Sequence, residues 1–296
     1  MKTDALALPT TRSRVEDFLA LTKPRLNSLV LVTTGVGYYL GSAAGLDLLA
    51  ALHAVMGTGL VAGGAAAFNQ LAEHDLDEVM DRTRWRPIPA GRVQATEAGA
   101  VAVILTIAGL TQLALGTNRL AATIALVTLV SYAAIYTPLK RRTPWATVVG
   151  AFPGALPPVI GWVAARGTLT AEAWALFGIV FVWQLPHFYA LSWLYREDFR
   201  RAKLPLLAVL DSDGRSTARH ILGYTVLLLP VSLTPAFVGL AGLSYLIGAS
   251  ALGVAFFILA ARFAGHRTAE RARSLFLGSL LYLPLLWGLL VVHRAL

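Results

Sequence analysis

Nine apolar runs dominate the pattern of hydrophobic and polar positions along the chain. Each is about 20 residues long, enough to cross the roughly 30 Å of bilayer hydrocarbon as an α-helix. Several contain Gly or Pro, which membrane helices tolerate. The pattern predicts an all-α membrane protein, a single bundle of nine transmembrane helices near residues 26–45, 49–72, 97–116, 120–138, 145–164, 171–195, 219–241, 244–263 and 274–293.

Charged residues are concentrated in the segments between these runs, and their distribution predicts an orientation. Lys and Arg accumulate on the cytoplasmic side of membrane proteins. With nine alternating spans, only three of the 25 Lys and Arg residues fall on the side opposite the N-terminus. We therefore expect a cytoplasmic N-terminus and cytoplasmic loops at 73–96, 139–144 and 196–218.

Composition supports a membrane protein. The 296 residues are 56% hydrophobic and 14% charged, whereas a soluble domain is about a quarter charged. The net charge of +9 follows from the basic loops, so it does not indicate a nucleic-acid partner. Cysteine is absent, which excludes disulfides, thiolate metal sites and a cysteine nucleophile.

The chain contains no long linker, so we treat residues 1–296 as a single domain. Residues 1–25 form its cytoplasmic tail. Apolar positions in this tail lie close to Glu16 and Asp17, and Pro24 follows them. The pattern predicts a short interfacial helix that ends before Pro24, with apolar residues Val15, Phe18, Leu19 and Leu21.

Five acidic residues stand within nine positions at the end of the second apolar run: Glu73, Asp75, Asp77, Glu78 and Asp81. The four-residue spacing of Asn69, Glu73 and Asp77 places these three on one helical face. Carboxylate and amide oxygens are the ligands that Mg²⁺ prefers. A solvated helix end explains the same charges, so both interpretations stay open. We expect Glu78 and Asp81 to face solvent.

Arginines follow these acids, at Arg82, Arg84, Arg86 and Arg92, around the stiff segment Pro87-Ile88-Pro89. Snorkelling and the positive-inside bias explain basic residues at this face without a ligand. Carboxylates for a metal beside guanidinium groups for phosphate oxygens would instead bind a diphosphate.

A second basic segment follows the fourth run. Tyr136 and Lys140 are four residues apart there, and Arg141 comes next. Topology alone predicts basic residues at this position. Because Tyr136 and Lys140 share a helical face, a binding role for the two residues is the alternative.

The sixth run ends in Trp183-Gln184-Leu185-Pro186-His187-Phe188-Tyr189. Helical spacing places His187 on one stripe with Asp198. An ionisable residue within a span often marks a functional site, and a histidine hydrogen-bonded to a neighbouring helix is the alternative. The second and sixth runs both lead into acidic and then basic residues and proline, a faint internal repeat that suggests two facing halves.

With these motifs the chain resembles the UbiA superfamily of intramembrane prenyltransferases, and within it the protohaem IX farnesyltransferase (haem O synthase) branch. The motifs, spread over most of the chain, are Leu21-Thr22-Lys23-Pro24-Arg25, Asn69-xxx-Glu73-x-Asp75-x-Asp77-xx-Met80-x-Arg82-Thr83-xx-Arg86-Pro87, Tyr136-Thr137 with Leu139-Lys140-Arg141, Trp183-Gln184-x-Pro186-His187-Phe188, and Asp198-Phe199-xx-Ala202-x-Leu204-Pro205.

The resemblance implies roles for individual residues. Asn69, Glu73 and Asp77 are implied to bind Mg²⁺-diphosphate, with Glu73, Asp77 and Asp198 as metal ligands and catalytic groups. The implied substrate-binding residues are Arg82, Arg86, Tyr136, Lys140, Arg141 and His187, the last on the haem side.

The chain departs from the superfamily pattern in two places. Glu73 stands where Asp is common, a change of one methylene. The second acidic motif is usually Asp-xxx-Asp, but Leu194 and Ala202 flank Asp198 at that spacing. The candidates for a second metal site are therefore Glu197, Asp198, Asp211 and Asp213.

The implied reaction transfers a farnesyl group from farnesyl diphosphate to a vinyl group of haem b, giving haem O, with Mg²⁺ as cofactor. The implied location is the bacterial inner membrane, with the polar site at the cytoplasmic mouth of the bundle. Prenylation of another acceptor, such as a quinone precursor or a chlorophyllide, and transport of an anionic substrate remain alternatives. Whether haem A synthase or a terminal-oxidase assembly factor docks to the chain stays open.

Overall fold

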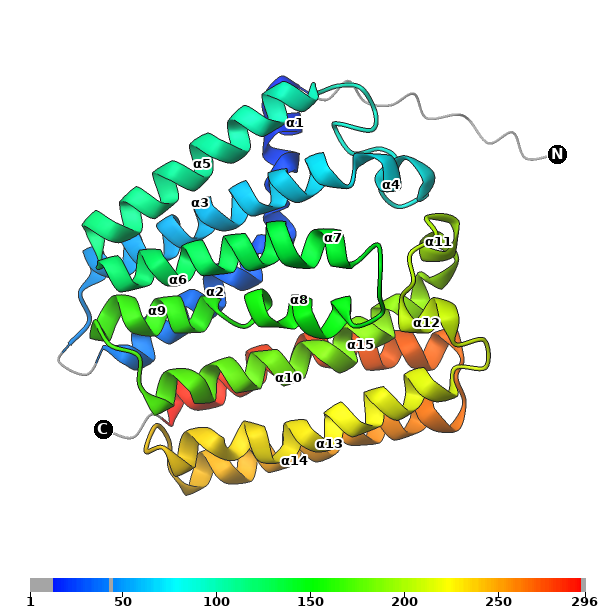
Figure 1. Cartoon of the computed structure of the whole chain (residues 1–296). Coiled ribbons are helices and arrows are strands. Elements are labelled where there is room, and N and C mark those ends of the chain that lie inside the picture. The colour runs from blue at the N-terminus through cyan, green and yellow to red at the C-terminus, as the bar shows by residue number, and fades with distance from the viewer. Residues whose placement is uncertain (1–12, 43–44, 294–296) are drawn as a thin grey trace.

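Long helices packed side by side make up the chain, as the computed structural model shows for residues 13–42 and 45–293 (Figure 1). Most run the full height of the bundle, and two of them are interrupted by changes of helix type or a short turn. The long elements are α2 (Pro24–Gly41), α3 (Leu48–Ala72), α5 (Ala95–Gly116), α6 (Arg119–Val130) continued by η1 (Ser131–Tyr136) and α7 (Thr137–Leu139), α8 (Ala146–Gly154) with α9 (Pro157–Arg166), α10 (Ala171–Leu194), α13 (Arg215–Phe237), α14 (Leu243–Gly265) and α15 (Ala269–Val292).

Eight of the described helical segments are long and apolar enough to cross a membrane. They match the last eight predicted runs to within about five residues. The predicted first span, 26–45, corresponds to α2, which is not among the eight because its first two turns hold Arg25, Asn27 and Ser28. It nevertheless packs against α3 and α9.

Glycines bring α2 and α9 into backbone contact. A Cβ atom at Gly37 would lie 2.0 Å from the carbonyl oxygen of Pro158, and one at Gly161 would lie 2.0 Å from that of Thr34. Small residues allow such close approach between membrane helices. This contact fixes α2, and with it the residue at its N-terminal end, relative to the rest of the bundle.

Helix α1 (Arg14–Leu21) confirms the predicted short helix. Ser13 and Glu16 form a capping box at its start, which satisfies otherwise unpaired backbone N–H groups. Its Asp17 is buried and accepts a hydrogen bond from Arg92 Nε at 2.9 Å. Pro24 is the first residue of α2. Residues 1–12 of the predicted tail lie outside the described residues.

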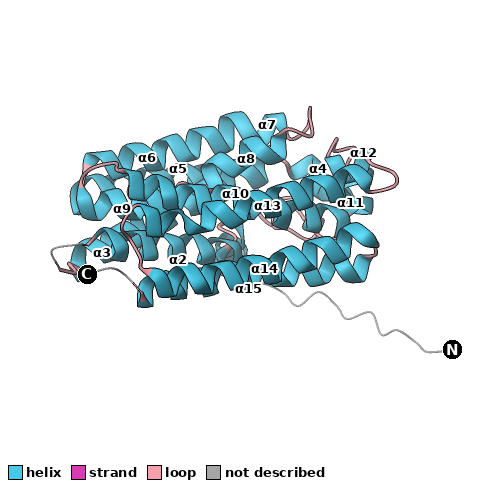
Figure 2. Cartoon of the chain, turned by 90° about the horizontal axis from the view of Figure 1, so that it is seen from below, coloured by secondary structure: helices cyan, strands magenta, loops and turns pink. Residues whose placement is uncertain are grey.

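Short helices gather at one end of the bundle: α4 (His74–Val79), α11 (Arg196–Arg201) and α12 (Leu207–Leu210) (Figure 2). An apolar cluster joins the segment after α3 to the segment after α10, and its buried members are Met80, Phe199, Ala202, Leu204 and Leu206. The two acidic segments of the sequence therefore meet at this end.

Candidate active site at one end of the bundle

Asn69, Glu73 and Asp77 lie together at the junction of α3 and α4. They are only 4%, 2% and 1% exposed. The structure interrupts the predicted helix at Glu73, whose backbone angles are φ −113° and ψ 14°. The bonds from Glu73 N to Asn69 O (3.0 Å) and from Asp77 N to Glu73 O (2.9 Å) preserve the four-residue spacing. All three side chains therefore stay buried, while Asp81 lies beyond the end of α4.

Each of these three side chains contacts a cation from a different segment of the chain. The contacts are Lys23 Nζ to Asn69 Oδ1 at 2.6 Å, Lys140 Nζ to the Glu73 carboxylate at 3.0 and 3.2 Å, and Arg86 Nη1 to Asp77 Oδ2 at 2.6 Å. Buried carboxylates need such partners, because an unpaired charge away from water is costly.

Lys23 is the site residue that sequence reasoning missed. Its backbone lies in the left-handed region, with φ 48° and ψ 58°, a conformation that costs a non-glycine residue on the order of 1 kcal/mol. Burial, followed by the nearby charge of Arg86, lowers the pKa of Lys23 to about 7. Its place before Pro24 suggested only a structural anchor, and nothing local in the sequence indicated that its side chain reaches Asn69.

The segment between α4 and α5 positions Arg86. Thr83 is buried, and its hydroxyl donates to the carbonyl oxygen of Asp77 at 3.1 Å. Arg92, already paired with Asp17, also donates to the Trp85 carbonyl oxygen at 2.9 Å. These bonds tie the segment to both α4 and α1.

Arg82 follows α4 and lies close to the segment that follows α10. Its guanidinium carbon is 5.4 Å from the ring centroid of Tyr195, at the junction of α10 and α11. It also interacts electrostatically with Asp77 and Asp198, and burial lowers the pKa of its guanidinium. Arg82 therefore faces both acidic segments.

The second basic segment divides into an inner and an outer residue. The π-helix η1 and α7 lead to Lys140, which faces Glu73. Arg141 points away from it and donates to Asp75 and to the Ala72 carbonyl oxygen, each at 2.9 Å. This pairing holds the pKa of Asp75 below its usual range. Tyr136 packs its ring on Tyr132, with centroids 5.4 Å apart.

Asp198 is buried and is paired with an arginine of its own helix. It accepts a hydrogen bond from Arg201, which also bonds Asp81 at 2.6 Å. Asp81, expected to face solvent, is 56% exposed yet paired, while Glu78 is exposed. Within residues 13–42 and 45–293, no three or more His, Asp or Glu side chains are grouped closely enough to hold a metal ion.

His187 lies on α10 and bonds a neighbouring helix. Its Nδ1 is 2.7 Å from Ser279 Oγ on α15, and its ring stacks on Trp183 with centroids 5.2 Å apart. Trp183 Nε1 donates to the Ser279 carbonyl oxygen at 2.9 Å. The predicted stripe from His187 to Asp198 is interrupted at Tyr195, where α10 ends.

The side chains of Asn69, Glu73 and Asp77 are suited to bind a hard cation. Asp77 Oδ1 is buried and has no hydrogen-bond partner, so a lone-pair oxygen is left unsatisfied beside Asn69 and Glu73. Buried polar atoms are normally paired, and two carboxylates with one amide oxygen are suitable donors for Mg²⁺.

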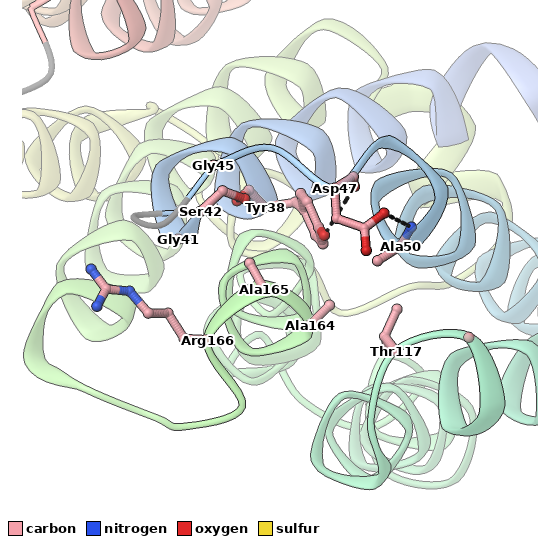
Figure 3. Close-up of a pocket in the computed structure, with 11 residues that line it drawn as sticks. Tyr38, Gly41, Ser42, Gly45, Asp47, Ala50, Thr117, Ala164, Ala165 and Arg166 are labelled. Atoms are coloured by element: carbon pink, nitrogen blue, oxygen red, sulfur yellow. Dashed lines mark hydrogen bonds between the residues drawn. The ribbon is translucent and has the colours of Figure 1, made fainter.

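The opposite end of the bundle holds a separate cavity of about 470 Å³ (Figure 3). Asp47 lines it, but its Oδ1 caps α3 by accepting from the N–H groups of Leu49 and Ala50, both at 3.0 Å. None of the predicted site residues borders this cavity. The convergent charges lie at the α4 end.

Known proteins resemble this chain over most of its length. Residues 30–287 match the UbiA prenyltransferase family. A protein of Solibacter usitatus (strain Ellin6076) named protoheme IX farnesyltransferase is 50% identical over 289 residues, covering 95% of this chain and 99% of that protein.

Solved structures show the same fold. A digeranylgeranylglyceryl phosphate synthase matches with a TM-score of 0.79 and 18% identity, over 94% of this chain and 98% of that one. A UbiA homologue from Archaeoglobus fulgidus bound to GPP and Mg²⁺ matches with a TM-score of 0.66 and 16% identity, over 93% and 99% of the two chains. The family match and the 50% identical relative, each extending over most of the sequence, show that the chain belongs to the UbiA prenyltransferase family of membrane enzymes.

Proposed function

We propose that this enzyme transfers the farnesyl group of farnesyl diphosphate to a vinyl group of haem b, releasing diphosphate and forming haem O. The observation that carries the proposal is the buried group of Asn69, Glu73 and Asp77, met by Lys23, Lys140 and Arg86. The 50% identity to a protein named protoheme IX farnesyltransferase supports the choice of acceptor.

The basic residues would bind the leaving group. Asn69, Glu73 and Asp77 would hold Mg²⁺, which supplies positive charge to the diphosphate oxygens. Arg86 and Lys140, which pair with Asp77 and Glu73 in the structure, would then be free to bind phosphate oxygens, together with Lys23 and Arg82. Cations fixed at the position where negative charge develops favour cleavage of the allylic C–O bond.

The remaining steps need no covalent enzyme intermediate. The vinyl group of haem b would attack C1 of the farnesyl cation, and water would capture the resulting cation and release one proton, giving the hydroxyethylfarnesyl side chain. The apolar helices of the bundle exclude other water from the cation before this capture.

His187 would contact the haem through its second ring nitrogen. If the Ser279 hydroxyl donates to the Phe276 carbonyl oxygen at 2.6 Å, His187 Nδ1 is the donor in the 2.7 Å contact between the two side chains. Nε2 then carries the lone pair, the form in which histidine binds a metal, because ligating histidines donate their other N–H. Asp198 would act through the arginines on its side of the site.

The topology follows from the charge bias. We propose that α2 is the ninth span and that the N-terminus and the α4 end of the bundle face the cytoplasm of a bacterial inner membrane. Lys140, Arg86 and Arg201 all lie at that end, which agrees with the positive-inside rule.

Replacing Asp77 by Ala tests the proposal. The variant should yield membranes without haem O at normal expression, measured by mass spectrometry of extracted haems. Glu78→Ala is the matched control, since Glu78 is the exposed neighbour of Asp77. Haem O at the wild-type level in the Asp77 variant would refute the scheme.

A further inference from the structure

The helix break at Glu73 has a close counterpart at Tyr195. Helix α3 ends at Ala72, and the six-residue α4 follows Glu73, with φ −113° and ψ 14°. Helix α10 ends at Leu194, and the six-residue α11 follows Tyr195, with φ −108° and ψ 23°. The two junctions therefore share one backbone geometry.

Backbone hydrogen bonds set the equivalent positions. Tyr195 N donates to Leu191 O and Phe199 N to Tyr195 O, both at 3.1 Å. These are the counterparts of the bonds that link Asn69, Glu73 and Asp77. Leu191, Tyr195 and Phe199 therefore occupy the positions at which the first half places its three oxygen donors. Of the three, Tyr195 alone has a side-chain oxygen, and Phe199 belongs to the apolar cluster with Met80.

The acidic residues near the second junction each have a partner, but none of them stands at the positions equivalent to Asn69, Glu73 and Asp77. Asp198 and Glu197 pair with Arg201 and Arg200. Asp211 Oδ2 accepts from the N–H and hydroxyl of Thr217 at 2.7 and 2.9 Å. Asp213 pairs with Arg215 at 3.1 Å. Three His, Asp or Glu side chains are not grouped at either junction in the part of the chain that the structure describes, and the first junction differs in adding the buried amide of Asn69 to its two carboxylates.

Arg82 occupies the space between the two junctions. Its guanidinium lies over the Tyr195 ring at 5.4 Å, and it interacts electrostatically with both Asp77 and Asp198. A planar guanidinium carries a permanent charge and a fork of donors suited to phosphate oxygens. At the second junction, a guanidinium that comes from the first half of the chain thus lies over Tyr195, whereas the first junction carries the metal ligands.

We propose that the site binds one divalent cation, held by the first half, and that Arg82 supplies to the diphosphate the positive charge that a second metal ion would otherwise bring. This rests on the proposed function and specifies its metal stoichiometry. The asymmetry of the repeat is then functional, because one junction holds the metal and the other holds the arginine.

Counting bound Mn²⁺ tests the inference on the full chain in lipid nanodiscs. Free Mn²⁺ is measured by electron paramagnetic resonance at saturating farnesyl thiodiphosphate, an analogue that ionises slowly. We expect one Mn²⁺ per chain. A count of two would overturn the inference while leaving prenyl transfer in place, whereas a count of zero would also overturn the metal step of the proposed function.

The role of Arg82 is tested with Arg82→Met and the control Arg84→Met. Arg84 lies in the same segment, 52% exposed, and is 3.6 Å from Asp81. Arg82→Met should retain one Mn²⁺ and bind the analogue about 10- to 100-fold more weakly, the range for a lost charged hydrogen bond. Arg84→Met should match the wild type. Unchanged analogue affinity in Arg82→Met would overturn the assignment.

Discussion

Replacing Arg86 by Met should change metal affinity and diphosphate affinity in opposite directions. In the structure Arg86 Nη1 lies 2.6 Å from Asp77 Oδ2, with the side chains 23% and 1% exposed. Under the proposed function, the same arginine would compete with a cation for Asp77 and would donate to phosphate once the cation is bound. Removing it frees the carboxylate for metal and removes a donor to the diphosphate.

The geometry sets the size of both effects. Two unit charges 2.6 Å apart attract by about 6 kcal/mol at an effective dielectric constant of about 20. Arg86 is 23% exposed, so solvent screening lowers this toward the roughly 1.5–3 kcal/mol of a charged hydrogen bond. We expect Mn²⁺ alone to bind about 10- to 100-fold more tightly and the diphosphate analogue to bind weaker by a similar factor.

Isothermal titration calorimetry of the nanodisc protein measures both affinities. Mn²⁺ is titrated first without substrate, and farnesyl thiodiphosphate is then titrated at saturating Mn²⁺. Arg84→Met is the control, because Arg84 lies over the exposed Trp85 ring, 5.1 Å from its centroid, in the same segment. A parallel fall of both affinities in Arg86→Met would mean that Arg86 only stabilises the fold. An unchanged metal affinity would refute the competition for Asp77.

Substitutions of Lys140, Gly161 and Arg201 test three further contacts in the structure. Lys140→Met should raise the KM for farnesyl diphosphate about tenfold or more in a haem O assay, because the diphosphate would lose the charged hydrogen bond of an ammonium group that lies 3.0 and 3.2 Å from the Glu73 carboxylate oxygens. Gly161→Ala should lower the unfolding free energy by about 3 kcal/mol, because the new Cβ would lie 2.0 Å from the Thr34 carbonyl oxygen. Thermal unfolding in detergent measures this loss. The control is Gly35→Ala, whose new Cβ would lie 3.8 Å from its nearest atom. Arg201→Gln should leave the unfolding midpoint in the same assay close to the wild-type value, since the side chain is 49% exposed and solvent screens its ion pairs.

The parts of the site that sequence analysis predicted are those set by local periodicity. The four-residue spacing of Asn69, Glu73 and Asp77 survives in the structure because the backbone bonds continue through the junction. Eight of the nine apolar runs likewise correspond to helices apolar enough to span a membrane. Both features depend on residues within a few turns of one another.

The parts that could not be predicted depend on contacts between distant segments. Lys23 meets Asn69, 46 residues away, and His187 meets Ser279, 92 residues away. Neither Glu73 nor Tyr195 stands beside a Gly or Pro that would indicate a helix break. The apolar cluster formed by Met80 and Phe199 with neighbouring residues packs the two short helices together, so the breaks become visible only once the chain has folded.

The charge balance of the site supports a single metal ion. Two buried carboxylates, Glu73 and Asp77, face Lys23, Lys140 and Arg86, with Arg82 beside them. Even without Lys23, whose pKa is about 7, Lys140, Arg86 and Arg82 outnumber the two carboxylates before any ligand binds. A prenyl diphosphate brings more negative charge than one Mg²⁺ neutralises, and the surplus cations offset the remainder. A second divalent ion would leave a larger uncompensated positive charge beside the membrane, where unpaired charge is costly. One metal ion together with Arg82 thus fits the electrostatics better than two.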